Sequence, residues 1–286
     1  MAKIGVQAMM LKESFAEVGA FETLRKVSAI GYNAVEVSQI PMTPENVDEL
    51  GRARTELGMD IAALSVAVEG RKGFPVESLA DDFEKIVDDA KGLDSKLLRI
   101  GMLPFPAMKS LDAVVDFAKT ANGYAERLQE HGISLYYHNH HVEFAKFDGK
   151  YMLDIIADNS PAMGMEIDVH WVQRGGLDPV RTLQKYAGKT AMVHLKDYRI
   201  GQMPESSFGL LEQGDFAGFM AEFKNVVQFA EVGEGNLDFP SIVPAAIEAG
   251  AQYLLVEQDE LYGRTVWDAL QTSHDNLVAM GHSDLF

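Results

Sequence analysis

The segment GISLYYHNH, residues 132–140, decides the fold because it contains a unit that recurs along the chain. A glycine comes first, an apolar run follows it, and the run ends in polar residues. Glycine readily adopts the left-handed conformation that ends a helix, which suits its place before a strand. A short run that is apolar throughout is typical of a parallel strand covered on both faces. We therefore predict a helix that ends before Gly132 and a buried strand after it.

The same unit occurs at six other places, and the opening residues KIGVQ supply one more strand. Most of the units are separated by the length of one strand plus one helix. The segments between them have helical periodicity, as in FETLRKVSAI, residues 21–30, whose apolar side chains fall near one stripe. The six units are GYNAVEVSQ from Gly31, GMDIAALSV from Gly58, GLDSKLLRIG from Gly92, PAMGMEIDVHW from Pro161, GKTAMVHLKD from Gly188 and GAQYLLVEQD from Gly250.

Eight alternating units predict an α/β protein whose single domain, residues 1–286, is a closed (β/α)8 TIM barrel. The alternative is a doubly wound open sheet, which usually has fewer strands and a phosphate-binding glycine loop after the first one. The residues that follow KIGVQ are AMMLKES, which lack that loop. The longest spacing predicts an insertion after the seventh strand, roughly at residues 198–230. A lid, a subunit contact and a tolerated surface loop are all consistent with this insertion.

Composition and charge narrow the possible partners. The net charge of −18 and the scattered lysines and arginines argue against nucleic acid and against an acidic membrane surface. The chain has no cysteine, which excludes disulfides, thiolate metal sites and cysteine nucleophiles. The first residues lack the apolar core of a secretory signal, and the chain has no uninterrupted apolar run of membrane-spanning length. We expect a cytoplasmic protein.

Acidic and imidazole side chains collect at the ends of the last four expected strands. Function in such barrels is carried by the carboxyl ends of the strands, which meet at one mouth. Buried carboxylates in close company repel one another unless a positive charge lies between them. Oxygen-rich ligands with an imidazole suit Mn²⁺, Mg²⁺, Co²⁺ or Zn²⁺. We therefore predict one divalent metal whose ligands, one from each strand end, are Glu143, Asp168, His194 and Glu257.

Each of these residues, taken alone, has another explanation. His194 lies in an apolar run and is compatible with a hydrogen-bonded core histidine. Asp168 is compatible with a cap of the next helix, and Glu143 with a solvated loop. The prediction depends on the coincidence of such residues at four successive strand ends.

Several motifs together resemble the xylose isomerase-like TIM barrel superfamily, in its sugar phosphate isomerase/epimerase branch. The resemblance covers essentially the whole chain, and each motif is weak when taken alone. The motifs are GYNAVEVS from Gly31, YHNHHVEF from Tyr137, DVHWVQRGG from Asp168 with DPV after it, VHLKD from Val193, VGEGNLDFP from Val232 and VEQD from Val256.

The resemblance implies one divalent metal held by Glu, Asp, His and Glu on the late strands, which agrees with the four ligands predicted above. Several relatives place the first Glu inside the fifth strand, nearer Tyr136, where this chain has no carboxylate. Either Glu143 reaches back from the loop, or His138 or His140 takes its place.

The resemblance also implies an isomerase or epimerase that acts on a small keto-sugar or cyclitol. A proton next to a carbonyl is hard to remove because charge builds on the oxygen. A metal that touches this oxygen stabilises the enediolate, and a nearby carboxylate or imidazole moves the proton. We predict catalytic roles for Glu257, His138, His140 and Glu143, and substrate binding by Glu36, Lys196 and Trp171.

The substrate-binding residues have alternative roles. Glu36 is equally well explained as a buried carboxylate paired with an arginine such as Arg99. Lys196 is compatible with an ion pair to Asp197 or another carboxylate, and Trp171 with simple packing.

Three other activities fit the same scaffold. A lyase or dehydratase on a keto-sugar or keto-inositol shares the enediolate step. A DNA-repair endonuclease of this superfamily uses three metals, and the acidic charge of the chain argues against it. A non-catalytic sugar-binding barrel needs no metal. The resemblance also implies that a homo-oligomer is possible, because dimers and tetramers are common in such barrels.

Overall fold

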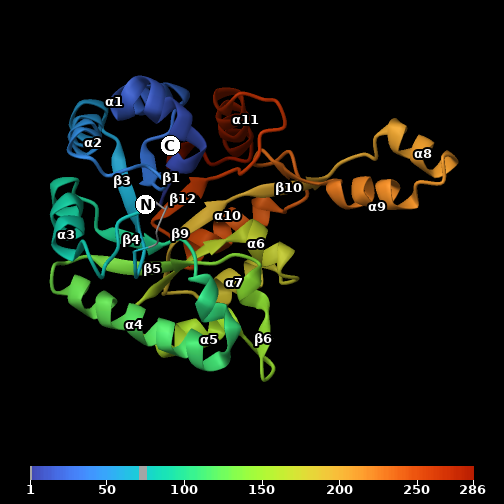
Figure 1. Ribbon diagram of the computed structural model, residues 1–286. Coiled ribbons are helices and arrows are strands. Elements are labelled where there is room, and N and C mark those ends of the chain that lie inside the picture. Colours follow the sequence, from blue (N-terminus) through green and yellow to red (C-terminus); the bar gives the residue numbers. More distant parts are fainter. Residues whose placement is uncertain (1, 71–75) are drawn as a thin grey trace.

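The computed structural model describes residues 2–70 and 76–286, and its main element is a closed barrel of eight parallel strands (Figure 1). The barrel closes because β1 (Lys3–Gln7) pairs with both β12 (Tyr253–Val256) and β2 (Ala34–Val37). All eight expected strands are present, and the predicted TIM barrel is confirmed. The other barrel strands are β3 (Asp60–Val66), β4 (Leu97–Ile100), β5 (Ser134–His138), β8 (Gly164–Asp168) and β9 (Thr190–Leu195).

Helices surround the barrel and cover the outer face of its strands (Figure 1). In α1, Leu24 and Val27 are buried and Phe21 and Ile30 pack against the core, which follows the stripe read from the sequence. The helices around the barrel are α1 (Lys12–Ile30), α2 (Pro44–Leu57), α3 (Phe83–Gly92), α4 (Leu111–Gln129), α5 (Met152–Asn159), α6 (Val169–Arg174), α7 (Pro179–Lys185), α10 (Phe239–Glu248) and α11 (Val266–Ala279). Short 3₁₀ helices are η1 (Ala8–Leu11), η2 (Phe105–Lys109), η3 (Val142–Phe144) and η4 (Ser283–Leu285).

Left-handed residues separate most helices from the strands that follow them. Gly58 has φ of 70° and caps α2, and Gly188 has φ of 79° before β9. The expectation differs from the structure before β4, where Asp94 rather than Gly92 has a positive φ, of 51°. An aspartate tolerates this conformation better than most side chains do.

The insertion predicted after the seventh barrel strand is confirmed. Strands β10 (Asp197–Ile200) and β11 (Val227–Ala230) form an antiparallel ribbon, and α8 (Glu205–Glu212) and α9 (Phe216–Asn225) lie between them. Figure 1 shows α8 and α9 extending away from the barrel. A smaller antiparallel pair, β6 (Lys146–Phe147) and β7 (Lys150–Tyr151), follows β5. Within the described ranges, every helix is too short or too polar to cross a bilayer.

Candidate active site

The inside of the barrel is built in layers because alternate residues of a strand face the same side. Ala34, Leu97, Met192 and Leu255 belong to a small apolar cluster. Two positions further along the same four strands stand Glu36, Arg99, His194 and Glu257, all buried. The interior therefore changes from apolar to charged toward the carboxyl ends of the strands.

An ionic layer, made of Glu36, Arg99, Glu166 and His194, lies on the apolar cluster. The Nε of Arg99 donates to Glu166 Oε2 at 2.7 Å and lies 3.1 Å from Glu36 Oε1. On the other side of these carboxylates, His194 Nε2 lies 3.0 Å from Glu36 Oε2 and 3.2 Å from Glu166 Oε1. Burial raises the pKa of Glu36 to about 7, although the charges of Arg99 and His194 act against this rise.

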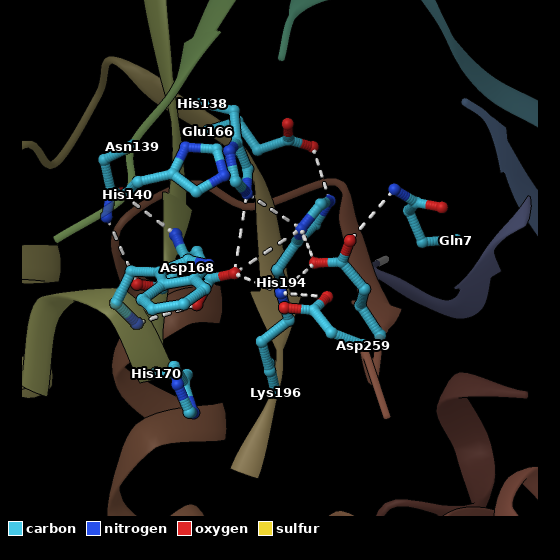
Figure 2. A network of polar contacts seen from close by, with 12 residues as sticks. Gln7, His138, Asn139, His140, Glu166, Asp168, His170, His194, Lys196 and Asp259 are labelled. Atoms are coloured by element: carbon cyan, nitrogen blue, oxygen red, sulfur yellow. Dashed lines mark hydrogen bonds and ion pairs between the residues drawn. The ribbon is translucent and has the colours of Figure 1, made fainter. Parts of the chain in front are cut away.

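A second group, which we call the donor cluster, consists of His138, Asp168, His194 and Glu257. All four residues are buried, and one donor atom from each lies within 4.8 Å of the others. His194 Nδ1 lies 2.8 Å from Glu257 Oε2 and 3.0 Å from His138 Nε2. The Oδ2 atom of Asp168 lies 3.5 Å from His138 Nε2. In Figure 2, His138, Asp168 and His194 point toward one another from three strands.

Backbone hydrogen bonds fix the end of β8, which presents Asp168 to the cluster. Asp168 Oδ1 accepts from the Trp171 backbone N–H at 3.0 Å and so caps α6. The Asp168 backbone N–H donates to the side chain of Asn139 at 3.0 Å. These bonds leave Oδ2 buried and without a hydrogen-bond partner. The helix-cap role expected as an alternative is therefore present, and it leaves one oxygen for the donor cluster.

The two nitrogens of His194 join the ionic layer to the donor cluster. Burial lowers the pKa of this imidazole, but the surrounding carboxylates, with Glu166 and Glu36 foremost, raise it well above its usual value. Burial raises the pKa of Glu257, but the charges of Lys196 and His194 hold it well below its usual range. The carboxylate of Glu257 therefore favours a positive charge in the centre of the cluster.

Lys196 forms the upper edge of the cluster and is 2% exposed. Its Nζ lies 2.9 Å from Glu257 Oε2 and 2.9 Å from Asp259 Oδ1. The same atom lies 5.2 Å from the centre of the Trp171 ring and 5.7 Å from that of Phe229. Burial lowers the pKa of Lys196, but Glu257 and its other acidic neighbours raise it above its usual value, so the side chain is charged. A fixed cation beside two aromatic rings suits the binding of a polar oxygen.

The structure brings most, but not all, of the predicted residues together. Glu143 lies in η3, where its Oε1 accepts from the Tyr137 hydroxyl at 2.6 Å and its Oε2 accepts from the His140 backbone N–H at 2.8 Å. It is buried there but is not among the four residues of the donor cluster. His138, the alternative first ligand, occupies that place. The end of β5 therefore supplies the imidazole of His138 to the cluster. The carboxylate of Glu143, in the loop that follows, instead accepts hydrogen bonds from Tyr137 and from the His140 backbone.

The other predicted residues lie around the cluster. The ring of His140 is 4.8 Å from that of His138 and 5.6 Å from that of Trp171, between centres. Burial, followed by the charge of His138, lowers the pKa of His140 to about 2. Glu36 makes the ion pair to Arg99 that was its alternative explanation.

Three residues at the site were missed by sequence reasoning. Glu166 lies in the ionic layer, and its position two residues before Asp168 was a signal that both face the interior. Gln7 donates to Glu257 Oε1 at 3.0 Å from the end of the first strand. Phe229, from the insertion, stacks on His170 with ring centres 4.8 Å apart. Nothing local in the sequence links this last residue to the mouth.

The donor set fits a divalent cation. Two imidazoles and two carboxylates suit Mn²⁺, Co²⁺ or Zn²⁺, with Mg²⁺ a weaker match for the imidazoles. The buried Asp168 Oδ2 lacks a hydrogen-bond partner. The ionic layer and the donor cluster contain four buried carboxylates and one permanently charged cation, Arg99, and Lys196 lies beside them. A divalent ion among these side chains would add to the positive charge that faces the carboxylates of Glu36, Glu166, Asp168 and Glu257.

Comparison with known proteins gives the family of the chain. Residues 24–270 match the family described as xylose isomerase-like TIM barrel. The chain belongs to this family. A curated relative is the rhizopine catabolism protein MocC of Rhizobium meliloti, 25% identical over 170 residues, which are 59% of this chain and 48% of that protein. The chain thus matches about half the length of that relative.

Solved structures share the xylose isomerase-like fold at low sequence identity. A sugar phosphate isomerase/epimerase from Parabacteroides distasonis is similar with a TM-score of 0.72 and 19% identity, over 98% of this chain and 94% of that one. The probable 3-DHS dehydratase AsbF from Bacillus anthracis is similar with a TM-score of 0.67 and 12% identity, over 97% of this chain and 99% of that one. At these identities the likeness shows the fold alone.

Proposed function

We propose that the chain is a divalent-metal-dependent isomerase or epimerase that acts on a small keto-sugar or cyclitol, with or without a phosphate. The observation that carries the proposal is the meeting of four buried donor groups from four strands beside a charged lysine. The isomerase/epimerase from Parabacteroides distasonis, which has the same fold, supports it as an analogy.

The donor cluster, His138, Asp168, His194 and Glu257, would hold the cation. A bound divalent ion would supply a Lewis acid that polarises a substrate oxygen. In this assignment His138 replaces Glu143 as the ligand from the fifth barrel strand, because both oxygens of Glu143 already accept hydrogen bonds.

Lys196 and the rings beside it would bind the substrate. The ammonium of Lys196 would donate to a carbonyl, hydroxyl or phosphate oxygen, and the rings of Trp171 and Phe229 beside it limit where that oxygen can lie. The aromatic faces pack against the C–H face of a sugar or cyclitol ring. Neither contribution requires the substrate to carry a phosphate.

Glu257 is the candidate proton carrier, and His140 is a candidate hydrogen-bonding partner of the substrate. Lys196 and His194 keep Glu257 ionised, as a general base requires. His140 borders the same mouth, and its Nδ1 is buried and without a hydrogen-bond partner, so the neutral imidazole would form a hydrogen bond to a substrate oxygen. Removal of a proton next to a carbonyl and its return to a neighbouring carbon or face is the isomerase or epimerase reaction.

A lyase or dehydratase is the second candidate. Its first step is the same proton removal, after which a substituent on the next carbon leaves instead of the proton returning. This second candidate is supported by the similarity of the fold to that of a probable dehydratase.

Elemental analysis of the purified protein tests the metal. We expect about one divalent ion per chain, and we expect Asp168→Asn and His194→Asn to lose it. The matched control is Asp116→Asn, an exposed residue on α4, which should keep the metal content of the unaltered protein. A folded protein that contains no divalent ion and binds none when Mn²⁺ is added would contradict the proposal.

Proton exchange separates the two reactions. Ketopentoses, ketohexoses and a 2-keto-inositol would each be incubated with the metal-loaded protein in deuterated water and followed by NMR. Deuterium entry next to the carbonyl with a retained carbon skeleton is expected for an isomerase or epimerase. Loss of water or of another substituent would instead assign the lyase reaction.

A further inference from the structure

The insertion exposes large apolar side chains of the kind that the helices around the barrel bury. We call residues 197–230 the arm. Its helices α8 and α9 expose Phe208 by 51%, Leu211 by 42%, Phe216 by 64% and Phe223 by 54%. Within the described structure, no residue between positions 201 and 229 belongs to the apolar core or packs against it as a partly buried apolar side chain. Exposed apolar surface of this extent indicates an interaction site.

The arm helices are too short to be stable by themselves. They have 8 and 10 residues, whereas isolated helices below about 12–15 residues are marginal in water. They support each other in part, since the rings of Phe208 and Phe219 have their centres 6.1 Å apart. A further surface that covers Phe216 and Phe223 would complete their packing.

The root of the arm is held firmly against the barrel. The carboxylate of Asp197 accepts backbone N–H groups of Tyr198, Gly233, Gly235 and Leu237, at 2.7–3.2 Å. On the other strand of the ribbon, Phe229 stacks on His170, and its N–H donates to the Tyr262 hydroxyl at 3.1 Å. A root fixed on both strands keeps the helices pointing away from their own barrel, as Figure 1 shows.

The charges of the arm restrict its partner. The two helices and the turn between them contain the carboxylates of Glu205, Glu212, Asp215 and Glu222 and a single cation, Lys224. Anionic lipid and nucleic acid would be repelled by this surface. The partner must offer apolar side chains with a neutral or basic surround.

The chain itself has such a surface, which we call the acceptor segment, residues 102–109. Met102 is 42% exposed and Phe105 is 54% exposed, and Lys109 lies at its end. In a chain of net charge −18, residues 95–111 contain no carboxylate. The segment follows β4 as the arm follows β9, so both start at the mouth of the barrel, with β8 and β5 between their strands.

We propose that the arm of one chain docks on the acceptor segment of a second copy, and that the second arm docks reciprocally on the first copy. Such a pairing is closed by a twofold axis, which gives each copy the same contacts. The two arm helices and the acceptor segment together provide roughly the 20–30 residues a side of a standard stable interface. The acceptor segment borders the mouth, so the partner's arm lies at the rim of the candidate site.

Sedimentation velocity tests the dimer. The unaltered chain, of 31.5 kDa, is expected to sediment as a dimer at micromolar concentration. Phe216→Glu with Phe223→Glu should weaken dimerisation at least about 30-fold, as expected for buried aromatic anchors. Met102→Glu should do the same from the other side. The control is Val278→Glu, 38% exposed on α11, which should leave the dimer intact. Circular dichroism checks that each variant is folded.

Disulfide cross-linking tests which surfaces meet. Because the chain has no cysteine, only the introduced cysteines can form the bond. Chains with Glu212→Cys are mixed with chains with Lys109→Cys under oxidising conditions, and a cross-linked pair of the two variants is expected. Lys119→Cys, exposed on α4, replaces Lys109→Cys in the control mixture and should give little product. A monomeric native protein, a dimer that survives the arm substitutions, or equal cross-linking in both mixtures would each overturn the proposal.

Discussion

The Nε2 atom of His194 lies 3.0 Å from the Oε2 atom of Glu36, and Arg99 holds the same carboxylate from its other side. The second nitrogen of His194 faces the donor cluster. A carboxylate that accepts a hydrogen bond from a metal-binding histidine fixes the tautomer and orientation of the ring and raises its basicity. Glu36 therefore acts on the proposed metal through His194, although it is not itself in the donor cluster.

Replacement of Glu36 by Gln should weaken Mn²⁺ binding about 10–100-fold, the usual effect of losing such a partner. The amide keeps the shape of the side chain but removes the charge that supports His194. Isothermal titration calorimetry measures the affinity, and Glu222→Gln on the arm is the control for the loss of one carboxylate. An affinity equal to that of the unaltered protein would show that His194 needs no support from the ionic layer.

Replacement of Glu143 by Gln should leave about one metal ion per chain. Both oxygens of Glu143 accept hydrogen bonds, from Tyr137 and from the His140 backbone, so the expected cost is in stability, about 1–3 kcal/mol. Elemental analysis and denaturant unfolding measure the two effects separately. Loss of the metal from a folded Glu143→Gln protein, with His138→Asn retaining it, would return Glu143 to the ligand set.

The fold was predictable because it depends on local patterns that repeat. Seven barrel strands are apolar runs after a helix-ending residue, and the opening run KIGVQ is the eighth. Few architectures accommodate eight such runs that alternate with helices. Asp168, His194 and Glu257 were predictable for the same reason, since each lies on or just past the end of a strand that faces the mouth. The structure brings these three together as expected.

The rest of the site depends on geometry that a pattern does not contain. Glu143 lies in a 3₁₀ turn, where one residue of rotation decides whether a carboxylate faces the mouth or its own backbone. The choice among Glu143, His138 and His140 as the first ligand was therefore open in the sequence. Phe229 is far from His170 in the sequence and reaches it because β10 and β11 pair as a ribbon. The register of this pairing cannot be read from a local sequence pattern.

Replacement of Arg99 by Met should destabilise the protein by about 3–5 kcal/mol, because it leaves the buried carboxylates of Glu36 and Glu166 without their cation. Urea unfolding measures the change. The triple variant Arg99→Met, Glu36→Gln, Glu166→Gln removes the charges together and should recover part of the loss. A single variant as stable as the unaltered protein would mean that these carboxylates are neutral in the folded state.

Replacement of Asp197 by Asn should loosen the loop at the root of the arm. Each carboxylate oxygen accepts two backbone N–H groups: Oδ2 from Gly233 and Gly235, and Oδ1 from Tyr198 and Leu237. Whichever way an Asn amide turns, its NH₂ group faces two donors, and their hydrogen bonds are lost. We expect a loss of stability of about 1–3 kcal/mol by denaturant unfolding.

Hydrogen exchange locates the effect of Asp197→Asn. Exchange should become faster in residues 233–237 and stay unchanged in α4, which is distant along the chain and has no bond to this carboxylate. Asp116→Asn, exposed on α4, removes the same charge and should change neither stability nor exchange at the loop. If the two variants were equally stable and their loops exchanged alike, the four hydrogen bonds of Asp197 would contribute nothing to the position of the arm.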